Sequence, residues 1–402
     1  MDLDPVGKAV LVLVLSVIAW PGSAGAAGAE DCRTIEVRES ASGDVVVGIE
    51  DVIVDTTRGR LWLSAHDRSV RDQSGGIYAL PIEGLKNGAD VVSLPNAVLP
   101  HVDEPFRPHG IAISPSGRRL FVIDQGRTSG GGTSILRVID LTEEGDVDAV
   151  RTVEDPRLCR ANDVLAIDEH EVLISRERGS CGKVSGWFET VLGLERGEVV
   201  RVRVEDPVGG VGSVADGIFF ANGLNRDLDG TVWVAASRGK ELISIGSDGG
   251  TEDRIPLPGG PDNISRMPDG RLLVAVHPSL LRLAGAFSLG VDRITPGSRI
   301  TAVDTRTHEV DILFEDDDGS LFSAATTAIA TNGHLVAGSV IDAGLLACRY
   351  RSVDEASASR NQAIASRTVS SSGRGTNPSS VRAREPSKPG VASASLTPSS
   401  GP

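Results

Sequence analysis

Oxygen-bearing side chains recur at one place in a repeated segment of this sequence. Five segments place a polar group about eight residues before a turn: Glu50 and Asp51, His109, Asn162 and Asp163, Asn222, and Asp262 with Asn263. A sixth segment has Thr326 and Thr327 there. Carboxylate and amide oxygens suit calcium, which takes six to eight such ligands with loose geometry. Magnesium demands a tighter octahedron and zinc favours nitrogen or sulfur, so the pattern predicts a calcium site.

The segments that position these residues share a β-type stretch, a polar turn and a second β-type stretch. They begin at Gly48, Pro108, Ala161, Ala221, Pro261 and Thr326, and their turns fall at Gly59, Gly117, His170, Gly230, Gly270 and Gly333. Alternating apolar residues such as Leu272, Val274 and Val276 are typical of half-buried strands. Six copies predict an all-β fold, a six-bladed β-propeller whose innermost strands begin around a central channel. A β-sandwich is the alternative, but it does not explain six copies.

A single Asp or Asn before a turn usually forms the turn or caps it. The repetition of oxygen-bearing residues at one register across five copies favours the metal site over that interpretation. In a propeller, polar residues from the first and fifth segments, more than 200 positions apart in the chain, are expected to meet on one axis.

The two ends of the chain differ from the repeats. Residues 9–20 are apolar but shorter than the roughly 20 residues that span a bilayer, and small residues follow. We interpret 1–29 as a secretory signal, with a retained apolar helix as the alternative. Residues 352–402 are rich in Ser, Pro and Arg and predict a disordered tail, which leaves 30–351 for the propeller. The protein is expected to be exported, periplasmic or secreted, with membrane association only if the leader is retained.

Four cysteines and the net charge limit the remaining possibilities. An exported chain with an even number of cysteines predicts disulfides, here Cys32–Cys348 around the whole core and Cys159–Cys181 around a polar loop. No Cys or Cys/His spacing fits a thiolate zinc site. The net charge of −15 argues against nucleic acid as a partner.

Several motifs together resemble the paraoxonase/arylesterase family. They are GIED, PHGIAIS, NDVLAI, FANGLN, and PDNIS followed by VAVHPS, and the resemblance runs from about Cys32 to Tyr350. It implies two calcium ions in the channel. The catalytic ion would be held by Glu50, Asn162, Asn222, Asp262 and Asn263, and a structural ion by Asp51, Asp163 and the backbone carbonyl of Ile111. The family's terminal disulfide matches Cys32 and Cys348. Gluconolactonase-type propellers share the architecture but carry fewer of these motifs.

The resemblance implies a hydrolase of lactones and aryl esters, in which calcium polarises the carbonyl of a small-molecule substrate. His109 is in register with the ligands and is our candidate base for the attacking water, while His277 is expected to line the pocket. The family's second His is replaced by Gln125, preceded by Asp124, and another family His falls near Arg178. A gluconolactonase-type sugar lactonase and a non-catalytic propeller that binds a partner remain the alternatives.

The residues between 180 and 195 are expected to form a loop beside this pocket. Trp187 and Phe188 are its large apolar side chains, and they are suited either to wall the pocket or to anchor the loop.

Overall fold

The computed structural model describes residues 28–350 except 71–72, 87, 99–101, 103–104, 127–133, 206–209, 247–248 and 292. The predicted leader, apart from its last two residues, and the predicted tail lie outside the described residues, and so does the candidate unit of Asp354–Pro402. Within the described part, no helix is long and apolar enough to cross a lipid bilayer.

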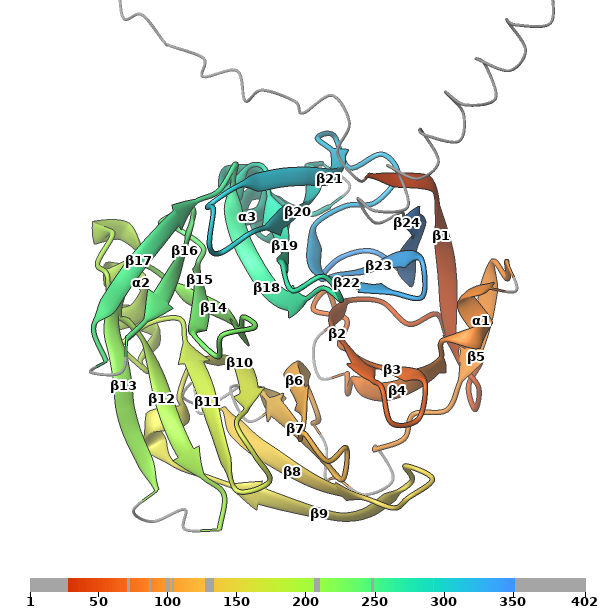
Figure 1. The fold of residues 1–402 in the computed structure, drawn as a ribbon, viewed down its shortest axis with the longest axis horizontal. Helices are drawn as coiled ribbons and strands as arrows, with labels where there is room; N and C mark the ends of the chain where they lie inside the picture. The colour runs from red at the N-terminus through yellow and green to blue at the C-terminus, as the bar shows by residue number, and fades with distance from the viewer. Residues whose placement is uncertain are drawn as a thin grey trace, which may run out of the picture. The chain divides into compact units, whose positions relative to one another are not determined.

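The strands form six sheets arranged as blades around a central axis, antiparallel except for one pair in the last blade, which confirms the predicted propeller (Figure 1). Blade 1 holds β2 (Ile49–Asp55), β3 (Arg60–Ala65) and β4 (Gly76–Pro81); blade 2 holds β6 (Pro108–Ile113), β7 (Arg119–Asp124), β8 (Ile135–Leu141) and β9 (Val147–Val153). Blade 3 holds β10 (Ala161–Ala166), β11 (Glu171–Arg176), β12 (Gly197–Arg203) and β13 (Val211–Ile218). Blade 4 holds β14 (Ala221–Arg226), β15 (Val232–Ala236), β16 (Glu241–Ile245) and β17 (Thr251–Pro256).

The last two blades complete the ring. Blade 5 holds β18 (Gly260–Arg266), β19 (Leu272–His277), β20 (Ser298–Val303) and β21 (Val310–Asp316). Blade 6 holds β22 (Ala325–Thr331), β23 (His334–Ser339) and β24 (Leu345–Tyr350), extended by β1 (Ala29–Glu39) and β5 (Val91–Leu94). The innermost strands β2, β6, β10, β14, β18 and β22 lie next to one another in this order.

Blade 6 is where the ring closes. β1 pairs antiparallel with β24, so the first described strand completes the last blade, and β5 adds to β1 in parallel. The disulfide Cys32–Cys348 joins the same two strands, and Cys159–Cys181 joins the start of blade 3 to the segment after β11. Both predicted pairings are therefore confirmed, and two disulfides are compatible with an extracellular protein.

Six apolar clusters fill the interfaces between neighbouring blades. The alternation of a strand explains how each blade contributes to two of them. On β3, Leu61 and Leu63 pack toward blade 6, while Trp62 between them packs toward blade 2. Because both faces of each sheet are buried, the second strands read as nearly continuous apolar runs.

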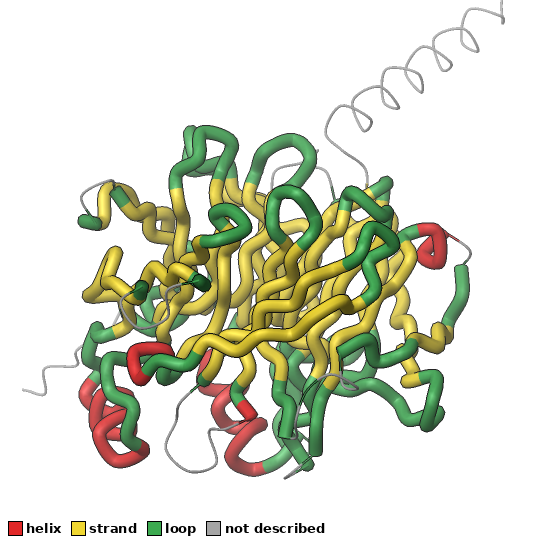
Figure 2. The backbone as a smooth tube through the Cα atoms, turned by 90° about the horizontal axis from the view of Figure 1, so that it is seen from below, coloured by secondary structure: helices red, strands yellow, loops and turns green. Residues whose placement is uncertain are grey.

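Helices are short and lie at the ends of the strands (Figure 2). They are α1 (Glu83–Lys86), the 3-10 turn η3 (Pro156–Leu158), α2 (Lys183–Leu192) and α3 (Leu280–Leu289). α3 begins at Ser279, whose hydroxyl accepts a hydrogen bond from the Arg282 backbone N–H, and ends at Gly290 with φ of 99°. The segment expected as a loop at 180–195 is instead built largely around α2, because its residues follow a helical rather than a two-residue period.

Candidate functional site

The predicted oxygen-bearing residues lie on the innermost strands, at the channel. Glu50 and Asp51 are on β2, His109 and Ile111 on β6, Asn162 and Asp163 on β10, Asn222 on β14, Asp262 and Asn263 on β18, and Thr326 and Thr327 on β22. All are less than a tenth exposed. The structure therefore brings together residues from the first and fifth repeats, more than 200 positions apart.

An irregularity in each innermost strand explains how consecutive residues both face the channel. In a regular strand, neighbouring side chains point to opposite faces. The pairing of every innermost strand with its second strand shifts register beside the polar residues, for example between Pro261 and Ile264 and between Ala161 and Val164. A bulge of this kind re-aims side chains next to a site. Glycines accompany it: a side chain at Gly223 would meet the Asn263 Cα at 2.6 Å.

The five residues predicted for the catalytic ion share an unusual feature, and we call them the oxygen set. They are Glu50, Asn162, Asn222, Asp262 and Asn263. In four of them one buried oxygen has no hydrogen-bond donor among the described residues: Glu50 Oε2 and the Oδ1 atoms of Asn162, Asn222 and Asn263. A buried oxygen without a donor costs about 1–3 kcal/mol. Four of them at one place fit a cation better than any internal contact.

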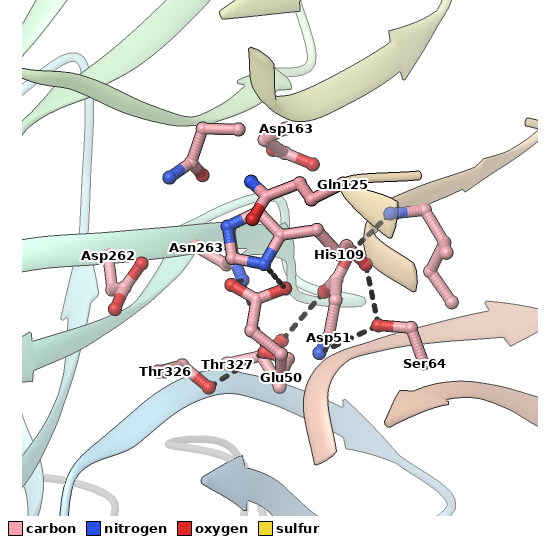
Figure 3. A network of polar contacts seen from close by, with 12 residues as sticks. Glu50, Asp51, Ser64, His109, Gln125, Asp163, Asp262, Asn263, Thr326 and Thr327 are labelled. Carbon is pink, nitrogen blue, oxygen red and sulfur yellow. Dashed lines mark hydrogen bonds and ion pairs between the residues drawn. The ribbon is translucent and has the colours of Figure 1, made fainter. Parts of the chain in front are cut away.

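The hydrogen bonds of these side chains hold their free oxygens in place. The Asn222 Nδ2 donates to Ser237 Oγ at 3.1 Å, and that hydroxyl donates to the Pro261 carbonyl at 2.6 Å. The Asn263 Nδ2 donates to Glu50 Oε1 at 3.2 Å. Thr326 donates to the Glu50 carbonyl at 2.7 Å, which ties β22 to β2 (Figure 3). The NH₂ group of each amide donates to a protein atom, whereas its oxygen receives no hydrogen bond from the described residues.

Glu50 carries the strongest electrostatic conflict. Burial, together with the charge of Asp51, raises the pKa of Glu50 well above its usual range, while Arg68 opposes the rise. Across the described residues, no group of three or more His, Cys, Asp or Glu side chains has the arrangement of a metal site. The oxygen set differs from such groups because amides supply three of its five side chains, and the donor-free oxygens are the observation that fits calcium.

Asp51 and Asp163, the pair predicted for a structural ion, are bound differently. Asp51 Oδ2 accepts the Ile111 N–H at 2.9 Å, and Asp163 Oδ2 accepts the Leu224 N–H at 2.7 Å. Each carboxylate thus receives a backbone donor from the next blade, and its other oxygen accepts the N–H of the following residue. Burial raises the pKa of Asp51 to about 6. A second ion at this pair remains a prediction, since these oxygens are not donor-free.

His109 faces Glu50 and an arginine that the sequence did not single out. Its Nδ1 lies 3.4 Å from Glu50 Oε2 and 2.6 Å from an Nη of Arg68 (Figure 3 draws the first contact). A guanidinium only donates, so Nδ1 accepts and the proton of the neutral ring sits on Nε2. Burial lowers the pKa of His109 well below its usual range, and Arg68 adds to this effect. The ring is therefore neutral near pH 7.

Asp124 and Gln125 stand where the resemblance places the second histidine, and both side chains bind other parts of blades 2 and 3. The Asp124 carboxylate pairs with Arg137 at 2.9 Å and accepts the Arg107 N–H at 3.0 Å. The Gln125 Nε2 donates to the Ala161 carbonyl at 3.0 Å. Asp124 pairs with Pro108 at the end of β7, and its carboxylate contacts Arg107 and Arg137.

His277, at the end of β19, holds a member of the oxygen set. Its Nε2 lies 2.7 Å from Asp262 Oδ2, and both side chains are buried. This contact holds the Asp262 carboxylate in one orientation through its Oδ2 atom.

A cavity of about 440 Å³ is lined by four residues of the oxygen set, all except Asn263. One side is polar and includes Glu50, His109, Asn162, Asn222, Asp262 and His277. The other is apolar and comes mainly from α3, through Leu280, Leu281, Leu283, Ala284 and Phe287, with Phe220. Arg178 lines the cavity, as its position in the sequence suggested, whereas Phe188 does not and is 52% exposed. The Trp187 side chain lies outside the described part.

The comparison with protein families decides the class of this propeller. The arylesterase family model matches residues 69–349, which cover most of the chain and four of the five residues of the oxygen set. The chain belongs to the arylesterase family. Membership supports hydrolysis of esters or lactones in general. Glu50 and Arg68 precede the matched residues.

Comparison with solved structures finds one match with a TM-score above 0.5, which supports the fold, and others below it. A protein of unknown function from Bacteroides thetaiotaomicron has a TM-score of 0.51 and 10% identity, and the match covers 80% of this chain and 76% of that one. A protein described as a gluconolactonase has a TM-score of 0.48 and 14% identity, with 81% and 93% covered. A luciferin-regenerating enzyme has a TM-score of 0.47 and 13% identity, with 78% and 95% covered. No curated protein matches the chain.

Proposed function

We propose that this chain is an exported, calcium-dependent hydrolase of lactones and aryl esters. The observation that supports calcium is the group of four buried oxygens without donors, three of which belong to residues that line a cavity in a member of the arylesterase family. Glu50, Asn162, Asn222, Asp262 and Asn263 would hold the catalytic ion. When bound there, calcium would polarise the substrate carbonyl and stabilise the charge that develops on its oxygen.

The remaining residues would bind the substrate and move a proton. Water attacks the acyl carbon, the bond to the alcohol oxygen breaks, and the proton from water passes through His109 to the leaving oxygen. His109 would take that proton at Nδ1, since Nε2 already carries one while Nδ1 accepts from Arg68. Arg68 must therefore donate elsewhere during the step. His277 would keep Asp262 oriented, and the apolar face of α3 would hold the acyl or aryl group.

The test is hydrolysis of phenyl acetate and of aromatic and aliphatic lactones by the purified full chain. Each substrate is assayed with excess calcium, after EGTA, and after calcium is restored. Turnover that disappears with EGTA and returns with calcium supports the proposal. Stoichiometric calcium binding without turnover on any substrate would contradict it and favour a non-catalytic propeller. A preference for sugar lactones within the panel would favour the gluconolactonase-type alternative.

A pair of variants on one strand tests the oxygen set itself. Asn222→Leu removes a donor-free oxygen, so we expect calcium affinity to fall about tenfold or more, by analogy with the 10- to 100-fold effect of losing supporting groups around a metal. Asn225→Leu is the matched control, because this residue is also on β14 but donates to the Ile264 carbonyl at 2.9 Å. Competition with a fluorescent chelator measures both. Equal affinities for Asn222→Leu and wild type would remove Asn222 from the site.

A further inference from the structure

Arg68 lines the cavity, and it lies outside the repeated segments. It follows β3, in an irregular segment between β3 and β4. Its guanidinium contacts His109 and lines the same cavity as Glu50 and Asp262. Its second terminal nitrogen, Nη1, is buried and has no acceptor among the described residues. A buried guanidinium nitrogen without an acceptor is as costly as the donor-free oxygens beside it.

The charges that line the cavity balance only while the oxygen set is empty. Three are negative, Glu50, Glu177 and Asp262, and three are positive, Arg68, Arg178 and Arg238. If a divalent cation occupies the oxygen set, it neutralises Glu50 and Asp262. Three arginines then face Glu177 alone. The cavity of the loaded protein is therefore cationic at its floor and mouth.

Arg178 and Arg238 each lie over an aromatic ring, although Arg178 Nε, like Arg68 Nη1, has no acceptor among the described residues. Arg178 lies over the Phe220 ring at 5.6 Å and approaches Glu177 at 4.0 Å, and Arg238 lies over Phe219 at 5.1 Å. Arg68 is different, because its carboxylate neighbours are the ones that a cation would engage. A planar guanidinium pairs with a carboxylate through two parallel N–H donors, which suits it to a substrate anion.

We propose that Arg68 selects esters and lactones that carry a carboxylate on the acyl chain, so that the substrate is an amphipathic anion with its apolar part against α3. This inference rests on the proposed hydrolysis at the same site. It has a consequence for the base: a carboxylate that draws Arg68 away from His109 frees Nδ1 for the proton of water. The anionic substrate thus both fills the cavity and releases the ring.

Two matched substrates test the selection. Monophenyl glutarate ends in a carboxylate and phenyl pentanoate ends in a methyl group, with the same reacting ester. We expect Arg68→Met to lower the ratio of kcat/KM for monophenyl glutarate to kcat/KM for phenyl pentanoate about tenfold or more. Arg68→Lys keeps the charge without the planar pair of donors, so its selectivity for monophenyl glutarate should lie between those of wild type and Arg68→Met. Arg201→Met, on β12, the third strand of blade 3, and paired with Glu171, is the control for an arginine loss elsewhere.

A binding measurement separates this inference from the proposed hydrolysis. Calorimetry on the calcium-loaded chain compares glutarate with pentanoate, which share one carboxylate able to reach a metal. In wild type we expect glutarate to bind about tenfold more tightly, and in Arg68→Met we expect the difference to disappear. If no ester is hydrolysed but this preference is present and depends on Arg68, the proposed function fails and the anion site stands. Equal losses on both esters, or an unchanged glutarate preference in Arg68→Met, would overturn the inference.

Discussion

His66 is a partly buried titratable side chain whose charge acts on His109. It follows β3, and its Nε2 has no hydrogen-bond partner among the described residues. Burial lowers the pKa of His66 to about 4, and the charges of Arg68 and Arg107 add to the effect. The ring is therefore neutral in the folded protein at pH values where an unfolded chain would already protonate it.

This difference predicts a loss of stability in acid. Between pH 6.5 and about 4 the unfolded state binds a proton at His66 and the folded state does not, so the free energy of unfolding falls as the pH falls. A pKa unit corresponds to about 1.36 kcal/mol, and partial exposure reduces the effect. Between pH 7 and pH 5, we expect the free energy of unfolding of His66→Gln to fall by about 1–2 kcal/mol less than that of wild type. Urea unfolding in excess calcium measures both.

The control for this residue is the exposed His308, which pairs with Asp253 at 2.8 Å. His308→Gln removes a histidine from an exposed position, so its dependence of unfolding free energy on pH should follow that of wild type closely. Protonation of the carboxylates in the oxygen set affects every protein in the comparison, so it cancels in the differences. If His66→Gln and wild type lose the same stability on acidification, the buried ring is not protonated on unfolding in this range, and the interpretation is wrong.

At the scale of elements, the repeated segments predicted the innermost strands and what they carry. A two-residue period and a turn at a fixed distance are local properties, so six copies were enough to place Asn162, Asn222 and Asp262 on one axis. The same reasoning missed the parts that are not repeated. α3 forms the apolar wall of the cavity, yet its run of Leu280, Leu281 and Leu283 has no counterpart in other blades.

Arg68 and the closing strands were missed for a related reason. Arg68 lies in an irregular segment, where neither period nor turn chemistry fixes a side chain's direction, and only its contact with His109 reveals its place. Blade 1 has three strands because β5 pairs with β1 instead of extending β4. That exchange depends on pairing between distant segments, which a local pattern does not encode. The cysteines, in contrast, marked the closure directly.

The two disulfides span very different lengths of chain and allow an internal comparison. Cys32–Cys348 has a separation of 316 residues and Cys159–Cys181 has 22. In the chain-entropy account, the longer loop restricts the unfolded state more, by about 2 kcal/mol between these two lengths. We expect the Cys32→Ser, Cys348→Ser double variant to lose about 2 kcal/mol more unfolding free energy than the Cys159→Ser, Cys181→Ser variant, measured by urea unfolding.

Each double variant serves as the control for the other, since both remove one buried and one partly exposed sulfur. The pairing of β1 with β24 remains in the first variant and keeps the ring closed without the covalent bond. Equal losses for the two would contradict the chain-entropy account for these disulfides.

At the scale of the whole molecule, charge and fold oppose each other in the absence of calcium. The chain has a net charge of −15, and its topology gathers Glu50, Asp51, Asp163 and Asp262 around one axis. Like charges that are buried together destabilise a compact state. A bound cation would remove this repulsion and add stability that grows with its concentration, by about 4 kcal/mol at 1,000 times Kd. The propeller is therefore expected to depend on calcium for stability as well as for activity.

Glu50→Gln separates these two effects. The amide keeps an oxygen for the Asn263 Nδ2, and its NH₂ replaces an oxygen that receives no donor, so no hydrogen bond is lost. In excess EGTA we expect the variant to be more stable than wild type by about 1 kcal/mol, because one buried charge is gone. In millimolar calcium the order should reverse, since a ligand is lost.

Asp51→Asn is the matched variant, because this carboxylate belongs to the same cluster but accepts backbone N–H groups on both oxygens. An amide there sets an N–H against one of those donors, so relief of charge is offset and no gain in EGTA is expected. Thermal unfolding of the three proteins, with and without calcium, measures the order. A Glu50→Gln protein that is less stable than wild type in EGTA would mean that Arg68 already neutralises Glu50 in the calcium-free protein, and that the channel needs no cation to hold its shape.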